Sequence, residues 1–180
     1  MPGIWKLESM SKTLIPYRKG KKWGFCDEDK NILVPCIYQL VRGFQEGIAP
    51  VKLKNRWGAI DESGNLVIPC IYEESAKIFP LQFSEGLAVF SVKEKYGYMD
   101  KTGKVIIEPN YKLASWFIEG LAIVSVGGKY GFINKNTDLV IECKYDDVTS
   151  FDNGLAIVYY KKKRGYINKK GVEFWEEEKN

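Results

Sequence analysis

Apolar and polar residues alternate in short blocks along this chain. In "GLAVFSVKEKYGYMDKTGKVIIEPNY", residues 86–111, apolar runs of strand length are separated by small polar clusters. Asp followed by a short polar cluster and Gly is typical of a hairpin turn, because glycine accepts a positive φ and the Asp side chain caps its own turn. The pattern predicts three antiparallel strands, at 86–92, 96–100 and 104–111.

The same block recurs along the chain. Aromatic-Gly dipeptides, and Arg-Gly in the last copy, place glycines at 34, 39, 34 and 34 residue spacings, namely Gly24, Gly58, Gly97, Gly131 and Gly165. A tyrosine follows the first four glycines at a constant distance, at Tyr38, Tyr72, Tyr111 and Tyr145. A second glycine, preceded by Phe, ends each long connection, at Gly47, Gly86, Gly120 and Gly154. Coincident registers of this kind indicate an internal repeat.

Five whole units fit the chain, near residues 14–38, 48–72, 87–111, 121–145 and 155–175. We therefore predict an all-β fold, an open stacked or superhelical array of five three-stranded antiparallel meanders. It forms a single domain at 14–175, between an N-terminal arm at 1–13 and a charged tail at 176–180. A closed five-bladed propeller-like ring is the alternative, although rings often split one blade between the termini and no unit is split here.

The segments "KKWGF" and "NRWGA", followed by G-x-x-V-I-P-x-x-Y and F-x-E-G-L-A-V patterns, resemble the WG-repeat (KWG repeat) family. The resemblance covers about residues 14–175. It implies a bacterial all-β repeat protein that serves as a recognition or scaffolding surface and has no family-wide catalytic site. The chain departs from the family at the dipeptide, where Tyr replaces Trp in copies three and four and Arg in copy five. It also departs at a proline slot that holds Cys36, Cys70 and Cys143.

The amino-acid composition limits the classes of function to expect. The 180 residues are 45% apolar and 14% aromatic, enough for a packed core, and they include no histidine. The commonest general base and metal ligand is thus missing. We expect no enzyme activity, no cofactor and no metal site; a glycan-acting or glycan-binding protein is a further alternative, although no pair of acids is singled out. No leader peptide and no apolar run of membrane-spanning length is evident, so a cytoplasmic location without membrane contact is expected.

Three sets of repeated residues invite a functional interpretation. The cysteines at 36, 70 and 143 are interpreted as small buried side chains rather than metal or redox ligands. The dipeptide aromatics are interpreted as core between units rather than stacking platforms. The ladder of Asx residues at 27, 61, 100, 134 and 168 is expected to cap turns.

Basic residues gather at one kind of turn. More than half of the 27 Lys and Arg residues lie between the first and second strands of the units, forming what we call the basic rim. Its members are Arg18, Lys19, Lys21, Lys22, Lys52, Lys54, Arg56, Lys93, Lys95, Lys129, Lys161, Lys162, Lys163 and Arg164. Such a rim suits an acidic protein partner or, alternatively, nucleic acid. A solvated edge that resists aggregation has the same composition.

The second connection is five residues longer than the others and adds Ile78, Phe79, Pro80 and Leu81. Insertions in repeat proteins often mark the binding face, although such a loop can also bury its own apolar residues. The predicted function is therefore non-catalytic protein–protein interaction or scaffolding through the rim, the insertion or both. The sequence leaves the oligomeric state open.

Overall fold

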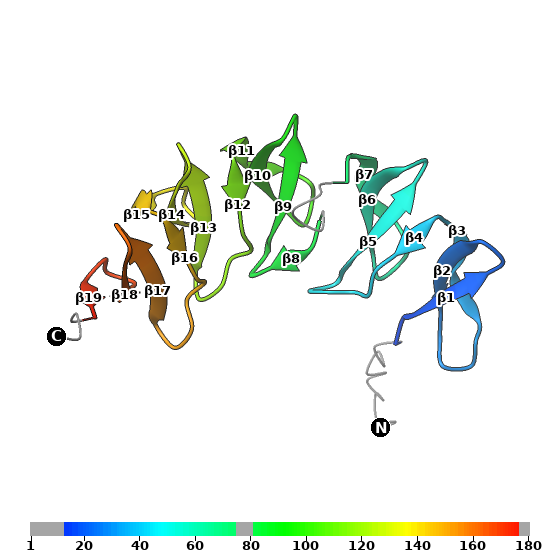
Figure 1. The fold of residues 1–180 in the computed structure, drawn as a ribbon. Coiled ribbons are helices and arrows are strands. Elements are labelled where there is room, and N and C mark those ends of the chain that lie inside the picture. The colour runs from blue at the N-terminus through cyan, green and yellow to red at the C-terminus, as the bar shows by residue number, and fades with distance from the viewer. Residues whose placement is uncertain (1–12, 75–80, 177–180) are drawn as a thin grey trace, which may run out of the picture.

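The computed structural model describes residues 13–74 and 81–176, which form five antiparallel sheets in succession (Figure 1). The first sheet holds β1 (Ile15–Lys19), β2 (Lys22–Cys26) and β3 (Ile32–Tyr38). The second holds β4 (Leu40–Val41), β5 (Ile48–Leu53), β6 (Arg56–Asp61) and β7 (Leu66–Tyr72). The third holds β8 (Phe83–Ser84), β9 (Leu87–Val92), β10 (Lys95–Asp100) and β11 (Val105–Tyr111). The fourth holds β12 (Leu113–Ala114), β13 (Leu121–Val126), β14 (Lys129–Asn134) and β15 (Leu139–Tyr145). The fifth holds β16 (Asp147–Val148), β17 (Leu155–Tyr160), β18 (Lys163–Asn168) and β19 (Glu173–Trp175).

The predicted all-β repeat array is confirmed, with one addition. Four of the described sheets carry a fourth strand of two residues, β4, β8, β12 or β16, ahead of the three-stranded meander. The sequence did not predict these strands, because two residues are too few to show an alternating pattern. They connect the last strand of one sheet to the first long strand of the next.

The glycine of each dipeptide is required by a close approach of two backbones. A Cβ added at Gly58 would lie 2.5 Å from the carbonyl oxygen of Ile68, and one at Gly97 would lie 2.4 Å from that of Ile107. The register between the second and third long strands shifts at this point in sheets one to four. Only glycine fits where a bulged neighbouring strand comes this near.

The core lies between consecutive sheets. Each sheet has an N-terminal face, toward the preceding sheet, and a C-terminal face, toward the following one. At the interface of sheets three and four, Tyr98 on the C-terminal face packs at a tilt against Phe117 of the next sheet, with ring centroids 4.9 Å apart. The pairs Phe25–Phe44 and Phe132–Phe151 repeat this contact at 4.9 and 4.8 Å. One recurring interface therefore holds the array together.

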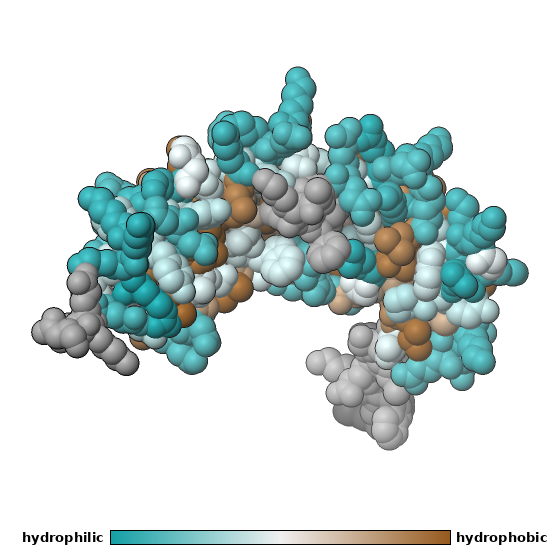
Figure 2. Space-filling model, viewed as in Figure 1, coloured by the Kyte–Doolittle hydropathy of each residue, from teal (hydrophilic) through white to brown (hydrophobic). Residues whose placement is uncertain are grey.

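The array is an open arc whose two ends lie apart (Figure 1), so the alternative of a closed ring is not what this chain forms. The tips of the long hairpins, β5–β6, β9–β10 and β13–β14, point to the convex side of the arc. The turns after β4, β8 and β16 lie on the concave side. Figure 2 shows hydrophilic residues along the convex outline.

Candidate partner-binding rim

The basic rim is carried by the tight hairpins that join the first and second strands of each three-stranded meander. Pairing continues to the ends of these strands, as in Leu53 with Arg56 and Val92 with Lys95, so only two residues form each of these tips. Because the sheets repeat along the arc, the fold places these tips in series. The sequence-predicted gathering of basic residues thus lies on equivalent hairpins.

Several tip lysines have a left-handed backbone. Lys54 has φ 50°, Lys93 has φ 49°, and the consecutive Lys161 and Lys162 have φ 50° and 67°. Asn and Gly are the residues that favour this conformation in two-residue hairpins, and the fourth sheet does use Gly127 with its neighbour there. A lysine in this conformation costs about 1 kcal/mol relative to glycine. Lysine is therefore present at these tips against the local backbone preference.

Some basic residues of the rim form ion pairs with acids, and others do not. Within the rim, four basic side chains pair with acids, in Lys52–Glu74, Arg56–Glu73, Lys129–Asp146 and Arg164–Glu176. Among the described residues, Lys54, Lys93, Lys161 and Lys162 have no acidic partner within ion-pair distance and are exposed. These four lysines lie at the hairpin tips, where Lys54 is followed by Asn55 and Lys93 by the acidic Glu94.

A hollow of about 390 Å³ adjoins the rim on the fifth sheet, lined by Tyr160, Lys161, Lys163, Trp175, Lys144 and Glu173. Tyr160 and Trp175 form its aromatic wall, with ring centroids 6.3 Å apart. The Lys161 ammonium lies 5.0 Å from the Tyr160 ring centroid. The side chains of Lys144, Tyr145 and Trp175 all bond to the Glu173 carboxylate, and the bonds from Lys144 and Tyr145 are the main causes of its lowered pKa. Basic and aromatic groups thus meet at this end of the rim.

The insertion after the second sheet contributes less surface than expected. Leu81 is fully buried in the core between sheets two and three, with its backbone N–H donating to the Val89 carbonyl at 3.3 Å. Leu81 is therefore not part of a binding surface, because the core already uses its side chain. Ile78, Phe79 and Pro80 lie outside the described residues.

The cysteines of the proline slot pack within their own sheets. Each cysteine thiol of the proline slot lies near a carbonyl oxygen of its own sheet, at 3.7 Å for Cys36 and Cys143 and 4.0 Å for Cys70. Burial raises the pKa of the Cys70 and Cys143 thiols. The described residues contain no cluster of three or more Cys, Asp or Glu placed to hold a metal ion.

The Asx ladder caps turns, as predicted. The Asp61 carboxylate accepts hydrogen bonds from the backbone N–H groups of Ser63 and Asn65, both at 2.9 Å. Asn134 caps its turn in the same way without a charge. The dipeptide aromatics vary more: Trp57 and Tyr96 are buried on C-terminal faces, whereas Trp23 is half-buried.

One set of contacts between sheets was not predicted from the sequence, and we call it the clasp. On the concave side, a glutamate in the tight turn of one sheet accepts a hydrogen bond from a glycine N–H of the next sheet and pairs with a lysine there. Glu85 contacts the Gly120 N–H at 3.1 Å and the Lys135 ammonium at 2.9 Å. The other clasps are Glu46 with Gly86 and Lys101, and Glu119 with Gly154 and Lys169. The recurring Glu-Gly dipeptide was the signal, but its partner lies a whole repeat away.

The clasp carboxylates are ionised at neutral pH. Partial burial alone would raise the pKa of Glu85, but the hydrogen bonds from Lys135 and from backbone N–H groups hold it below its usual value. The pKa of Glu46 is lowered against burial by Lys101 in the same way, and that of Glu119 is lowered chiefly by Lys169. All three clasp glutamates have φ near 52°, a conformation that glutamate does not favour.

Taken together, the described residues define an open array of small antiparallel sheets with a clasped concave side and a basic convex rim. Residues 23–57, 57–96, 96–130 and 130–163 match the family described as WG containing repeat. The chain therefore belongs to the WG-repeat family, as its dipeptides suggested. No helix that could span a membrane occurs in the described parts of the chain.

Solved structures resemble the fold at low sequence identity. A crystal structure of a eukaryotic initiation factor aligns with 89% of this chain and 51% of its own, at 13% identity and a TM-score of 0.55. Kluyveromyces lactis Hsv2 aligns with 91% of this chain and 59% of its own, at 12% identity and a TM-score of 0.50. The chain thus spans little more than half of either protein, and the likeness shows the fold alone. No curated protein sequence matches the chain.

Proposed function

We propose that this protein is a non-enzymatic interaction module whose basic rim binds an acidic surface on a protein partner. The observation that carries the proposal is the set of exposed lysines at left-handed tip positions, Lys54, Lys93, Lys161 and Lys162. Backbone strain at a position that makes no internal ion pair is a reason to look for an external role. Lysines on successive hairpins would meet a partner that presents carboxylates along its length.

The burial of the aromatic residues favours a protein partner over single-stranded nucleic acid. Non-specific strand binding combines basic grooves with exposed aromatic rings on which bases stack. Trp57 is fully buried and Tyr96 nearly so, and both are occupied by contacts between sheets. In sheets two and three the repeated aromatics therefore do not provide a stacking platform next to the rim, and the aromatic wall of Tyr160 and Trp175 is confined to the fifth sheet.

The arc also suits this role mechanically. Repeat arrays offer extended surfaces because each unit contacts only its neighbours. The clasps and the tilted aromatic pairs hold neighbouring sheets against each other, which supports a row of tips that is formed before a partner binds. A pre-formed row of charges loses less conformational entropy on binding than a flexible basic tail.

The test is affinity capture from the native host with tagged full-length protein, followed by identification of both protein and nucleic acid. The variant carries Lys54→Glu, Lys161→Glu and Lys162→Glu, three exposed lysines at two hairpin tips whose ammonium groups make no ion pair with the described acids. Reversal of rim charges should lower capture of the partner at least about tenfold, because association is steered by these charges.

A matched control carries Lys30→Glu, Lys104→Glu and Lys170→Glu, which changes the net charge equally in the turns away from the rim. This control should capture as well as the unchanged protein. Equal loss in both variants would show that net charge alone matters and would contradict the rim. If the capture recovers nucleic acid instead of protein, and high salt removes that nucleic acid, then the rim binds a phosphate backbone and the proposal of an acidic protein partner is wrong.

A further inference from the structure

The fifth sheet exposes a face that the other sheets bury. Leu155 is 43% exposed, whereas Leu87 and Leu121, the same position in sheets three and four, are 9% and 8% exposed. Phe174 pairs with Tyr166 as Ile141 pairs with Phe132 one sheet earlier. Phe174 is 51% exposed, against 4% for Ile141. The C-terminal face of the last described sheet is therefore a copy of an internal interface without its following sheet.

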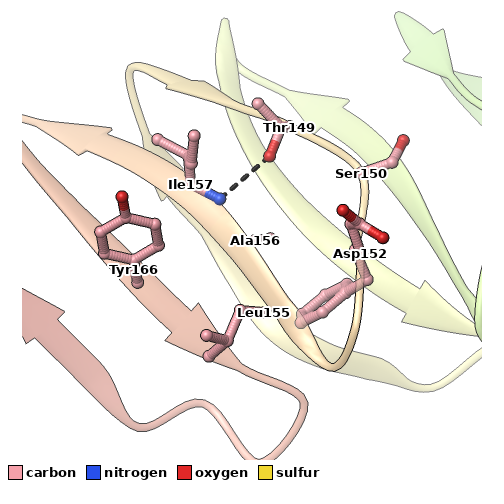
Figure 3. A pocket seen from close by; sticks show the side chains of 8 residues that line it. Thr149, Ser150, Asp152, Leu155, Ala156, Ile157 and Tyr166 are labelled. Carbon is pink, nitrogen blue, oxygen red and sulfur yellow. Dashed lines mark hydrogen bonds between the residues drawn. The ribbon is translucent and has the colours of Figure 1, made fainter.

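A hollow lies at this face, where the next sheet's phenylalanine would stand. It has a volume of about 510 Å³, and Leu155, Ile157 and Tyr166 project beside it from β17 and β18 (Figure 3). In the interface of sheets three and four, Phe117 packs in one cluster with the equivalent residues of that C-terminal face. The terminal hollow thus has the position of an aromatic docking pocket.

Tyr166 keeps a further feature of the internal interface. Tyr98, its equivalent in the third sheet, donates a hydrogen bond across the interface to the Ser115 carbonyl at 2.7 Å. The Tyr166 hydroxyl instead accepts a bond from Arg164 at 3.1 Å. A hydroxyl able to bond across an interface is therefore present on the exposed face.

The opposite end of the array offers a complementary face. Ile15 and Tyr17 pair with β2 in the register of Ala49 and Val51 with β6, so they occupy the positions that face a preceding sheet. Ile15 is 39% exposed and Tyr17 is half-buried. Ile in place of Ala and Tyr in place of Val together add about the carbon content of one phenylalanine side chain. The N-terminal face therefore carries extra bulk of the amount that fills an aromatic pocket.

The charges at the two ends are also compatible. Asn153 stands where Glu46, Glu85 and Glu119 form clasps, and Glu28 stands where Lys101 and its equivalents receive them. A glutamate at 153 would face Glu28 of an incoming first sheet with like charge, whereas the Asn153 amide has none. The substitution removes the repulsion that a glutamate at 153 would produce, while the Asp152 carboxylate beside the hollow accepts a hydrogen bond from the Asn153 amide.

We propose that the C-terminal face of the fifth sheet docks the N-terminal face of the first sheet of a second copy of this chain. The contact continues the internal interface, with Tyr17 and Ile15 of the second copy in the hollow beside Tyr166. It is heterologous, since it joins two different surfaces, so each copy has one free end of each kind. Successive copies would lengthen the basic rim.

The test is sedimentation equilibrium of the full chain from low micromolar to millimolar concentration. The unchanged protein is compared with two variants, each of which has one of the two end faces blocked by a substitution. Leu155→Glu blocks the C-terminal face and Ile15→Glu blocks the N-terminal face, each at a residue that is exposed in the single chain. The unchanged protein should gain mass with concentration, and each variant alone should stay at the 20.6 kDa of a single chain. An equimolar mixture of the two should form a dimer and stop there, because one intact end of each kind remains.

Other results would overturn the proposal. If the unchanged protein stays monomeric throughout, the end faces do not dock. If Ile15→Glu alone still self-associates, the contact joins two C-terminal faces and is not head to tail. Circular dichroism and thermal unfolding of both variants show whether the sheets are intact, and a variant with unaltered Leu155 and Ile15 but Lys104→Glu serves as the charge control.

Discussion

The substitution Glu85→Asn should change the stability of the protein in opposite directions, depending on whether local turn preference or the clasp dominates at the Glu-Gly turns. Glu85 and Gly86 form a two-residue turn with positive φ at both positions, the geometry for which Asn-Gly is the favoured sequence. Local turn preference alone therefore predicts that Glu85→Asn stabilises the protein. The clasp predicts the opposite, because the shorter, neutral side chain loses the Gly120 N–H and the Lys135 ammonium.

The magnitude follows from these contacts. A hydrogen bond to a carboxylate contributes about 1.5 kcal/mol at the lower end of its range, suited to a side chain that is 31% exposed. The partly exposed ion pair with Lys135 adds about 0.5 kcal/mol. Asn tolerates the left-handed conformation better than Glu, which offsets this loss of stability by less than about 1 kcal/mol. We expect a net destabilisation of about 1 kcal/mol.

Urea unfolding followed by circular dichroism measures the change, with midpoint and slope both recorded. Asn153→Glu is the matched control, because it places glutamate in the same turn of the fifth sheet, which has no further sheet after it among residues 13–74 and 81–176. It should destabilise slightly through the turn alone. If Glu85→Asn stabilises the protein, the clasp contributes less than the turn preference and the reasoning fails.

Three further predictions concern the packing and titration of the repeats. Gly97→Ala would place a Cβ 2.4 Å from a carbonyl oxygen of the neighbouring strand and should cost about 3 kcal/mol or more in urea unfolding. Gly20→Ala, with open space but φ 62°, should cost only about 1 kcal/mol, and equal costs would contradict the close approach. Tyr98→Phe should cost about 1 to 2 kcal/mol because the half-buried Ser115 carbonyl loses its donor, whereas Tyr166→Phe at the half-buried equivalent, whose hydroxyl accepts a bond from Arg164 of its own strand, should change the melting temperature little. The lowered pKa of Glu85 means that the unfolded chain binds more protons, so stability is retained above about pH 4.5 and falls as the pH drops through the lowered pKa. Glu85→Gln should flatten this dependence in unfolding measured from pH 6 to pH 3, and an unchanged slope would rule out the carboxylate as a contributor.

The repeat architecture was predictable because it is determined by residues that are close together in the sequence. Strand-length apolar runs, the Asx turn and the dipeptide glycine lie within one unit, and each acts through neighbours a few residues away. Asp61 capping its own turn is a case in which the residue type and its spacing suffice. The basic rim was likewise predictable, since a meander sends equivalent turns to the same edge.

Features between units were not predictable in the same way. The partner of Glu46 is Lys101, in the next sheet, and only the angle between sheets brings the two together. The two-residue strands depend on pairing with a neighbour and carry no pattern of their own. Leu81 shows the same limit, because its position in a long connection suggested exposure while tertiary packing places it in the core. Contacts set by the stacking of repeats require the structure.

The most direct test of the rim is lysine footprinting of the captured assembly. Free protein and partner-bound protein would be acetylated briefly, and the rate at each lysine would be read by mass spectrometry. The proposal predicts slower modification at Lys54, Lys161 and Lys162 in the bound state, and unchanged rates at Lys104 and Lys170 in the opposite turns. Protection of Lys104 and Lys170 with unchanged rates at the tips would place the partner on the other edge and contradict the proposal.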